Sequence, residues 1–234
     1  MTESTPLEAV WTAVPGAVPR TGLTLDRVVA AAIEIADAEG LGAVSMSRVA
    51  KRTGFTPMAL YRHVANKDEL VLHMQDRAMG PPPPELAATG DWRADTERWA
   101  WASLARIRAH PWYVQTLSTF GAPATPSHLL WAEAALQALA PTALTESEKV
   151  ETTLLINAHV VGDTTFHAIE TATEAVGVYD DVLARFLDEE RFPAVVRAVA
   201  AGAFAAGPDP AADRDALFRY GLDRILDGVA AYLA

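Results

Sequence analysis

Apolar residues recur at intervals of three and four along most of the chain, which is the spacing of one face of an α-helix. The first apolar stripe begins after Thr24 and ends before Gly40, and it consists of Leu25, Val28, Val29, Ala32, Ile33 and Ala36. No run of alternating β-branched residues continues beyond four or five positions, so signals for strands are nearly absent. The pattern therefore predicts an all-α fold.

A tight turn separates two short predicted helices within residues 44–67, VSMSRVAKRTGFTPMALYRHVANK. Ser45 is placed to cap the first helix, and Gly54 to end it in the left-handed conformation. Thr56 is placed to cap the second helix, and Pro57 occupies its first position, where the missing N–H costs nothing. Two short helices joined at a glycine turn form a helix-turn-helix, whose second helix would enter the major groove of DNA.

The same segment is basic inside an acidic protein. It contains Arg48, Lys51, Arg52, Arg62 and Lys67 and no Asp or Glu, whereas the whole chain has a formal net charge of −11. Residues 20–68 carry seven basic and five acidic side chains, a net charge of +2, which leaves −13 on the rest. The positive field is therefore confined to one end, and the acidic remainder would be held away from phosphate.

Several short motifs lie between residues 24 and 80. They are Ala38-Glu39-Gly40 at the end of the first helix, Val49-Ala50 and Gly54 in the helix-turn-helix, and then Leu60-Tyr61-Arg62-His63-Val64 and Asn66-Lys67-Asp68-Glu69-Leu70. With these motifs the segment resembles the DNA-binding domain of the tetracycline-repressor (TetR) family. Residues 91–234 resemble the all-helical regulatory domain of the same family, especially at FRYGLDRILDGV near the C-terminus.

The resemblance implies a transcriptional regulator, namely a repressor that binds a palindromic operator as a homodimer and is released by a small-molecule effector. Its expected partners are double-stranded operator DNA, a second copy of the chain and an effector of unknown identity, with no cofactor and no membrane. Two rival hypotheses stay open. One is a DNA-binding regulator that has no effector or acts as an activator, and the other is a helical small-molecule carrier or enzyme.

Four prolines at 81–84 follow Gly80 and cannot continue a helix, so they predict a stiff spacer between two domains. The expected organisation is a flexible N-terminal arm at 1–22, a helix-turn-helix DNA-binding domain at 23–80, a Pro-rich linker at 81–90, and a ligand-binding and dimerisation domain at 91–234. By the resemblance, the helix that precedes the prolines links the regulatory domain to the DNA-reading head.

The candidate DNA contacts lie in and beside the second helix of the helix-turn-helix. They are Ser47, Thr56, Pro57, Met58, Tyr61, Arg62, His63 and Lys67. Thr56 and Met58 stand at the start of this helix, the part that points at base edges. In the family's motif, the positions that match Tyr61, His63 and Lys67 touch the DNA backbone.

Arg62 departs from the aromatic residue that the family often has at this position, and a basic side chain there could add a contact to guanine or phosphate. Ser47 and Lys67 are the candidate phosphate contacts, the latter helped by the dipole of the helix that it begins. Packing roles are the alternative at two positions, because Met58 could serve only to fill space and Tyr61 could pin the second helix to the domain's first helix.

An apolar stripe on the last predicted helix, about 214–232, is the candidate dimer interface. Its members are Phe218, Gly221, Leu222, Ile225, Leu226 and Val229. Together with the long predicted helix at 146–173, this helix would form half of a four-helix interface. The alternative is that the stripe faces the chain's own core.

A set of aromatic and polar residues in the regulatory domain is the candidate effector site. It comprises Trp101, Leu104, Arg108, Trp112, Phe120, Trp131, His159, Asp163, Phe166 and His167. An apolar cavity with a few convergent polar groups is typical of a small-molecule site, although ordinary core packing is the alternative for each tryptophan. His159, Asp163 and His167 share one helical face, and they could bind an effector, pair across the dimer or, as the weakest hypothesis, bind a metal.

The sequence offers no recognisable catalytic motif, because it has no cysteine, no Gly-rich phosphate loop and no G-x-S-x-G elbow. Residues 109–132 contain no Asp, Glu, Lys or Arg, but prolines and polar residues interrupt them, so no membrane span is predicted. The N-terminus does not resemble a signal peptide, and the lack of cysteine fits a reducing compartment. We therefore expect a cytoplasmic protein that is not an enzyme.

Overall fold

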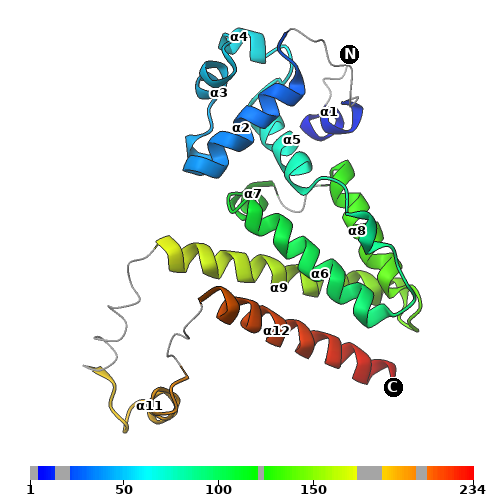
Figure 1. Cartoon of the computed structure of the whole chain (residues 1–234), viewed down its shortest axis with the longest axis vertical. Coiled ribbons are helices and arrows are strands. Elements are labelled where there is room, and N and C mark those ends of the chain that lie inside the picture. Colours follow the sequence, from blue (N-terminus) through cyan, green and yellow to red (C-terminus); the bar gives the residue numbers. More distant parts are fainter. Residues whose placement is uncertain (1–4, 14–21, 121–123, 173–185, 204–209) are drawn as a thin grey trace. The chain divides into compact units, whose positions relative to one another are not determined.

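The computed structural model describes residues 5–13, 22–120, 124–172, 186–203 and 210–234, and all regular structure in these ranges is helical (Figure 1). The all-α prediction is confirmed for this part of the chain. Two compact units are present, one comprising residues up to Asn157 and the other most of the residues from Ala158 onward. None of the helices in the described ranges is long and apolar enough to cross a membrane.

A small helical core supports the helix-turn-helix in the first unit. Helix α2 (Leu25–Glu39) packs against α3 (Met46–Thr53), α5 (Lys67–Met79) and the short η1 (Leu41–Ala43), while α3 contacts the single turn of α4 (Pro57–Leu60). The side chains that fill this core include Val28, Val29, Ala32, Val49, Leu60, Val64, Leu70 and Met74. Most of the apolar stripe predicted for α2 is therefore buried, as an amphipathic helix requires.

Side-chain caps fix where the helices of the head begin, and they are the caps that the sequence predicts. Thr24, Ser45 and Thr56 each accept a hydrogen bond from the backbone N–H three residues later, at 3.2, 3.3 and 3.3 Å. Asn66 caps α5 by accepting from the Glu69 N–H at 2.8 Å. Each such cap contributes about 1 kcal/mol, which matters most for α4 because four residues cannot sustain a helix alone.

The N-terminal segment differs from the expected flexible arm, because residues 5–13 are ordered and contain helix α1 (Pro6–Thr12). Thr5 and Glu8 form a reciprocal capping box, and Pro6 stands at the first helical position, so the local sequence favours a helix start. Helix α1 packs on α5 and buries Val10, and the indole N–H of Trp11 donates to the Ala124 carbonyl at 2.8 Å. For these residues the structure thus has a packed helix where an arm is expected.

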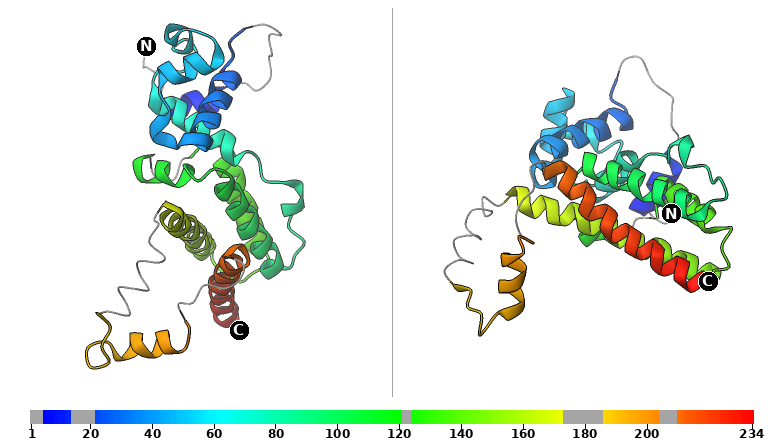
Figure 2. Two further views of the ribbon diagram at one scale, coloured as in Figure 1. Left: turned by 60° about the vertical axis from the view of Figure 1, so that its left-hand side comes forward. Right: turned by 60° about the horizontal axis from the view of Figure 1, so that its bottom comes forward.

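Helices of the regulatory region complete the first unit. Helix α6 (Trp92–Ala109) begins at Asp91, whose carboxylate accepts from the N–H groups of Arg93 and Ala94, and it ends at Ala109 because Pro111 follows. Helix α7 (Tyr113–Phe120) and helix α8 (Pro126–Leu139) follow, and the short η2 (Pro84–Leu86) occupies the Pro-rich segment. Helices α6 and α8 lie side by side in Figure 1 and in both views of Figure 2.

Helix α9 (Glu146–Ala172) begins in the first unit and continues into the second, where α11 (Pro193–Ala200) and α12 (Pro210–Leu233) are the other described helices. The long helix predicted at 146–173 and the last helix predicted at about 214–232 are thus both present. Residues of both helices line a groove that contains several of the candidate effector and dimer residues.

Candidate functional site

The turn of the helix-turn-helix depends on Gly54. Its backbone has φ +79° and ψ +21°, the left-handed region in which a side chain is strained. The N–H groups of Gly54 and Phe55 both donate to the Ala50 carbonyl, which closes the end of α3. The chain then reverses into Thr56, the cap of α4, as the sequence predicts.

The outer side of α4 and the turn after it carry the candidate DNA contacts. Met58 is 71% exposed and Tyr61 is 47% exposed, which is unusual for large apolar or aromatic side chains. The other exposed candidates are Ser47, Thr56, Pro57, Arg62 and Lys67, and His63 is half-buried. Leu60 on the opposite side is fully buried. Tyr61 is not used to fill the core of the head, and Met58 is available to a partner.

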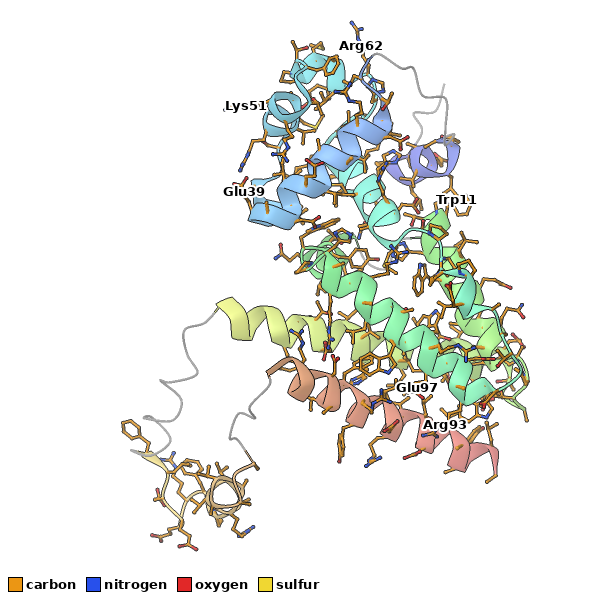
Figure 3. The ribbon with its side chains drawn as sticks, in the orientation of Figure 1. Trp11, Glu39, Lys51, Arg62, Arg93 and Glu97 are labelled. Carbon is orange, nitrogen blue, oxygen red and sulfur yellow. The ribbon has the colours of Figure 1, made fainter. Side chains whose placement is uncertain are left out.

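The basic residues of the segment fall into two groups that the sequence does not distinguish. Arg48 forms an ion pair with Glu39, and Arg52 forms one with Glu34 at 2.7 Å, so both guanidinium groups are directed at α2. The side chains of Lys51, Arg62 and Lys67 form no ion pair or hydrogen bond within the described part of the chain. In Figure 3, Lys51 and Arg62 extend away from the ribbon of the head.

Lys67 is the first residue of α5, where the unpaired backbone N–H groups and the helix dipole favour an anion. Asp68 and Glu69 follow it in the same turn, but the carboxylate of Glu69 is turned back to accept from the Ala65 N–H at 2.9 Å. The exposed ammonium of Lys67 therefore remains available at a helix terminus suited to a phosphate.

Most of the tryptophan set is engaged in packing and hydrogen bonds at separate places. Trp112 is 2% exposed and donates to Asp37 at 2.6 Å, while Trp131 is buried and donates to the Gly80 carbonyl at 2.9 Å. Leu104 is buried in the core, and Arg108 is half-buried. Trp101 lines a groove of about 500 Å³ beside the Pro-rich segment. Their hydrogen bonds lead to different elements, and the side chain of Phe120 lies outside the described residues.

Helices α9 and α12 enclose an open, largely apolar groove of about 470 Å³ in the second unit. Its lining consists of Ala158, His159, Gly162, Asp163, Phe166, Arg214, Leu217, Phe218, Tyr220 and Gly221. Three candidate effector residues, His159, Asp163 and Phe166, thus meet two candidate dimer residues, Phe218 and Gly221. The side chain of His167 lies outside the described residues. Among the side chains that are described, no group of three or more His, Cys, Asp or Glu could hold a metal.

His159 is held rigidly against α12 at the bottom of this groove. Its Nε2–H donates to the Phe218 carbonyl at 2.8 Å, and its ring stacks on the Phe218 ring with centroids 4.8 Å apart. The close approach needs a glycine, because a Cβ on Gly221 would lie at only 2.4 Å from His159 Cε1. The sequence pattern puts both residues on candidate surfaces, but the spacing along the chain cannot reveal that they touch.

The stripe of α12 is divided between core and surface. Phe218, Leu222 and Leu226 are fully buried within the single chain, whereas Gly221, Ile225 and Val229 are partly exposed. The most exposed apolar side chains of the groove are Phe166 at 70%, Leu217 at 67% and Tyr220 at 61%. The exposed apolar residues of α12, Leu217 and Tyr220, therefore each lie one position before a member of the predicted stripe, Phe218 and Gly221.

A buried polar cluster joins α5, α7 and α8, and no sequence motif predicts it. His128 hydrogen-bonds with the hydroxyls of Tyr113 and of Thr125, the latter at 2.7 Å, and its ring stacks on Tyr113. The side-chain amide of Gln75 donates to Thr116 Oγ1 at 2.5 Å. Burial raises the pKa of Tyr113 and lowers the pKa of His128 to about 4, so both side chains are neutral at pH 7.

This cluster predicts a stability that depends on pH. The pKa of His128 is about 4 in the folded protein and about 6.5 when unfolded, so protonation favours unfolding. The stabilisation is complete above pH 6.5 and falls as the pH drops toward 4. Between pH 7.5 and 5 the free energy of unfolding is expected to fall by about 2 kcal/mol more than in His128→Gln. Denaturant titrations of both proteins at each pH measure this difference, and parallel curves would contradict it.

Comparisons with known proteins place this geometry in a family. The model of the bacterial regulatory proteins of the tetR family matches residues 28–74, and the model of the tetracyclin repressor-like C-terminal domain matches residues 83–233. The HTH-type transcriptional repressor DrrR1 of Streptomyces coeruleorubidus is 37% identical over 240 residues, covering 97% of this chain and 86% of its own.

Solved structures agree with this result over nearly the whole chain. The TetR family protein ActR of Streptomyces coelicolor, in complex with actinorhodin, is 26% identical with a TM-score of 0.72, and the match covers 92% of this chain and 98% of ActR. A variant of TetR from Acinetobacter baumannii, in complex with minocycline, is 19% identical with a TM-score of 0.63. This match covers 91% of the present chain and 99% of the TetR variant. With its head built as a helix-turn-helix and both family models matched, the chain belongs to the TetR family of bacterial transcriptional regulators.

Proposed function

We propose that the protein is a homodimeric repressor that reads a palindromic operator through α4 and leaves it when a small molecule binds the regulatory domain. The geometry of the head supports this most directly. Helix α4 is capped by Thr56, held from behind by buried Leu60 and exposed on its outer side. Residues 23–80 would be the DNA-binding domain, 81–90 the linker, and 91–234 the ligand-binding and dimerisation domain.

Roles for the individual DNA contacts follow from exposure and charge. Thr56, Pro57 and Met58 stand at the start of α4, the end of a recognition helix that approaches base edges. Arg62 is an exposed cation that suits guanine or phosphate. Ser47, Tyr61, His63 and Lys67 flank the helix, and we assign them to phosphate oxygens, which position the head without reading sequence.

The groove between α9 and α12 is proposed as the surface that a second copy covers. Phe166, Leu217 and Tyr220 would otherwise present a cluster of exposed large apolar side chains, which a monomer in water rarely keeps. Homodimer interfaces are apolar and self-complementary, so the same groove of the partner is the expected occupant. Two heads would then contact half-sites about 34–36 Å apart.

The effector is proposed to be a small organic molecule, because structures of two relatives contain actinorhodin and minocycline. Its site is assigned to the regulatory domain, where Trp101 and Arg108 retain partly exposed side chains. His159 and Asp163 line the proposed dimer groove, so they are better suited to the contact between subunits than to the effector.

A test of this proposal measures binding to the DNA upstream of the protein's own gene against unrelated competitor DNA. Wild type should give a palindromic footprint. Lys67→Ala should weaken binding about tenfold or more and reduce the slope of log K against log salt by about 2, since each dimer loses two phosphate contacts.

Arg197→Ala is the matched control, because Arg197 is an exposed cation on α11 outside the DNA-binding head. It should leave both the affinity and the salt slope unchanged. Equal effects of the two substitutions would overturn the assignment of the head. The same holds if unrelated competitor DNA abolishes binding both to this fragment and to fragments selected from random sequence.

A further inference from the structure

We propose that Asp37 is the positioning residue through which the regulatory region holds the DNA-reading head in its orientation. The inference rests on the proposed function and adds a route between its two parts. Asp37 lies in the last turns of α2, on the head, and its contacts lie at the joint between α6 and α7 in the regulatory region.

Two side chains of the joint converge on one carboxylate oxygen. The indole N–H of Trp112 donates to Asp37 Oδ1 at 2.6 Å, and His110 Nδ1 lies 2.8 Å from the same atom. The two donors flank Pro111, which ends α6, so the backbone between them has little freedom. Trp112 is 2% exposed, and its N–H would be left without an acceptor if Asp37 withdrew.

The same end of α2 also holds α3. Glu34 and Glu39 pair with Arg52 and Arg48, while Asp37 between them faces the joint. Carboxylates near the C-terminus of a helix are unfavourable with respect to its dipole, and α2 has no basic residue in its last turn. The charges of all three acids are balanced by hydrogen bonds or ion pairs with side chains of other elements. These contacts make α2 a rigid link from the joint to α3.

The far side of the joint is equally well anchored. Tyr113 and Thr116 on α7 belong to the polar cluster that reaches Gln75 on α5 and His128 on α8. We therefore expect a displacement of α7 or of the end of α6 to be transmitted to Asp37, either by moving it or by breaking its two hydrogen bonds. Packed side chains and hydrogen-bond networks of this kind are what carry coupling between distant sites.

A role of Asp37 in stability alone would have different consequences from a role in positioning the head. If Asp37 only satisfied the buried indole N–H, its removal would lower the stability and leave the orientation of the head unchanged. If it positions the head, its removal would widen the range of orientations even where the fold persists. The distribution of distances between head and regulatory region separates the two roles.

The chain contains no cysteine, so spin labels can be placed cleanly. Lys51→Cys on the head and Gln137→Cys on α8 are both exposed positions, and the doubly labelled chain is diluted with unlabelled chain so that distances are measured within one subunit. Asp37→Ala should broaden this distance distribution. Asp37→Asn, which keeps an oxygen that accepts from Trp112, should retain a narrow one.

Asp26→Ala is the matched control, because it removes one exposed ion pair, with Arg77, from the same helix. It should leave the distribution narrow. Asp37→Ala should also weaken operator binding on the order of tenfold, the size typical of coupling between sites. A distribution in Asp37→Ala as narrow as in wild type would overturn the inference, whether or not operator binding is found. If the wild-type protein binds no operator although Asp37→Ala broadens the distance distribution, the result would count against the proposed function alone.

Discussion

Leu217→Glu is expected to convert the dimer into a monomer and to lower operator affinity by a factor of about 10³ or more. Leu217 is 67% exposed on α12 and lies in the groove with Phe166 and Tyr220. In the proposed interface a carboxylate at this place would be buried in a largely apolar contact, which costs several kcal/mol. Sedimentation at several protein concentrations measures the state of assembly, and fluorescence anisotropy with labelled operator measures the affinity.

Leu130→Glu provides the control for this substitution, since Leu130 on α8 is also exposed, at 50%, but does not line the groove. It should remain dimeric and bind the operator normally. A Leu217→Glu protein that stays dimeric would show that the subunits meet elsewhere. The groove would then have no partner, and its aromatic and polar lining would become the first candidate for the effector site.

Gly221→Leu is expected to lower the free energy of unfolding by about 3 kcal/mol. The new Cβ would lie 2.4 Å from the ring of His159, which would have to leave its stacking contact with Phe218 and its hydrogen bond to the backbone. The higher helix propensity of leucine returns only part of this loss, roughly 0.5–1 kcal/mol. Denaturant titrations at fixed protein concentration measure the change.

Gly228 on the same helix allows a matched comparison, because a Cβ there would meet no atom of the described chain within 4 Å. Gly228→Leu should therefore be neutral or slightly stabilising when tested in the monomeric Leu217→Glu protein. In that background Gly221→Leu should still be harmful, and His159→Ala should relieve part of the effect. Equal losses at the two glycines would refute the close approach of His159.

The head could be predicted from the sequence because its signals are local. Thr24, Ser45, Thr56 and Asn66 cap helices within three residues of themselves, and Gly54 is needed for a turn of its own. Thr5 and Glu8 carry the same kind of local signal, a capping box that begins α1, although the expected arm ignores it. These features require no knowledge of what lies beside them in space.

Contacts between distant segments could not be predicted in this way. Arg48 and Arg52 count as free charges in the sequence, yet acids 9 and 18 residues earlier neutralise them. The aromatic character of Trp112 suggests an effector contact, but its indole N–H is directed 75 residues back to Asp37. The partner of a long side chain depends on tertiary packing, about which helical spacing carries no information.

Within residues 56–64 the buried side chains support the fold and the exposed ones are free to contact DNA, which affects how such a regulator can change over evolution. Buried Leu60 and Val64 hold the one-turn helix in place, while Pro57, Met58, Tyr61 and Arg62 are exposed and contribute little to the fold. Substitutions at exposed positions usually change stability by less than about 0.5 kcal/mol. A lineage can therefore exchange these outer residues and acquire a new operator without an intermediate that fails to fold, which makes the head a scaffold for successive recognition codes.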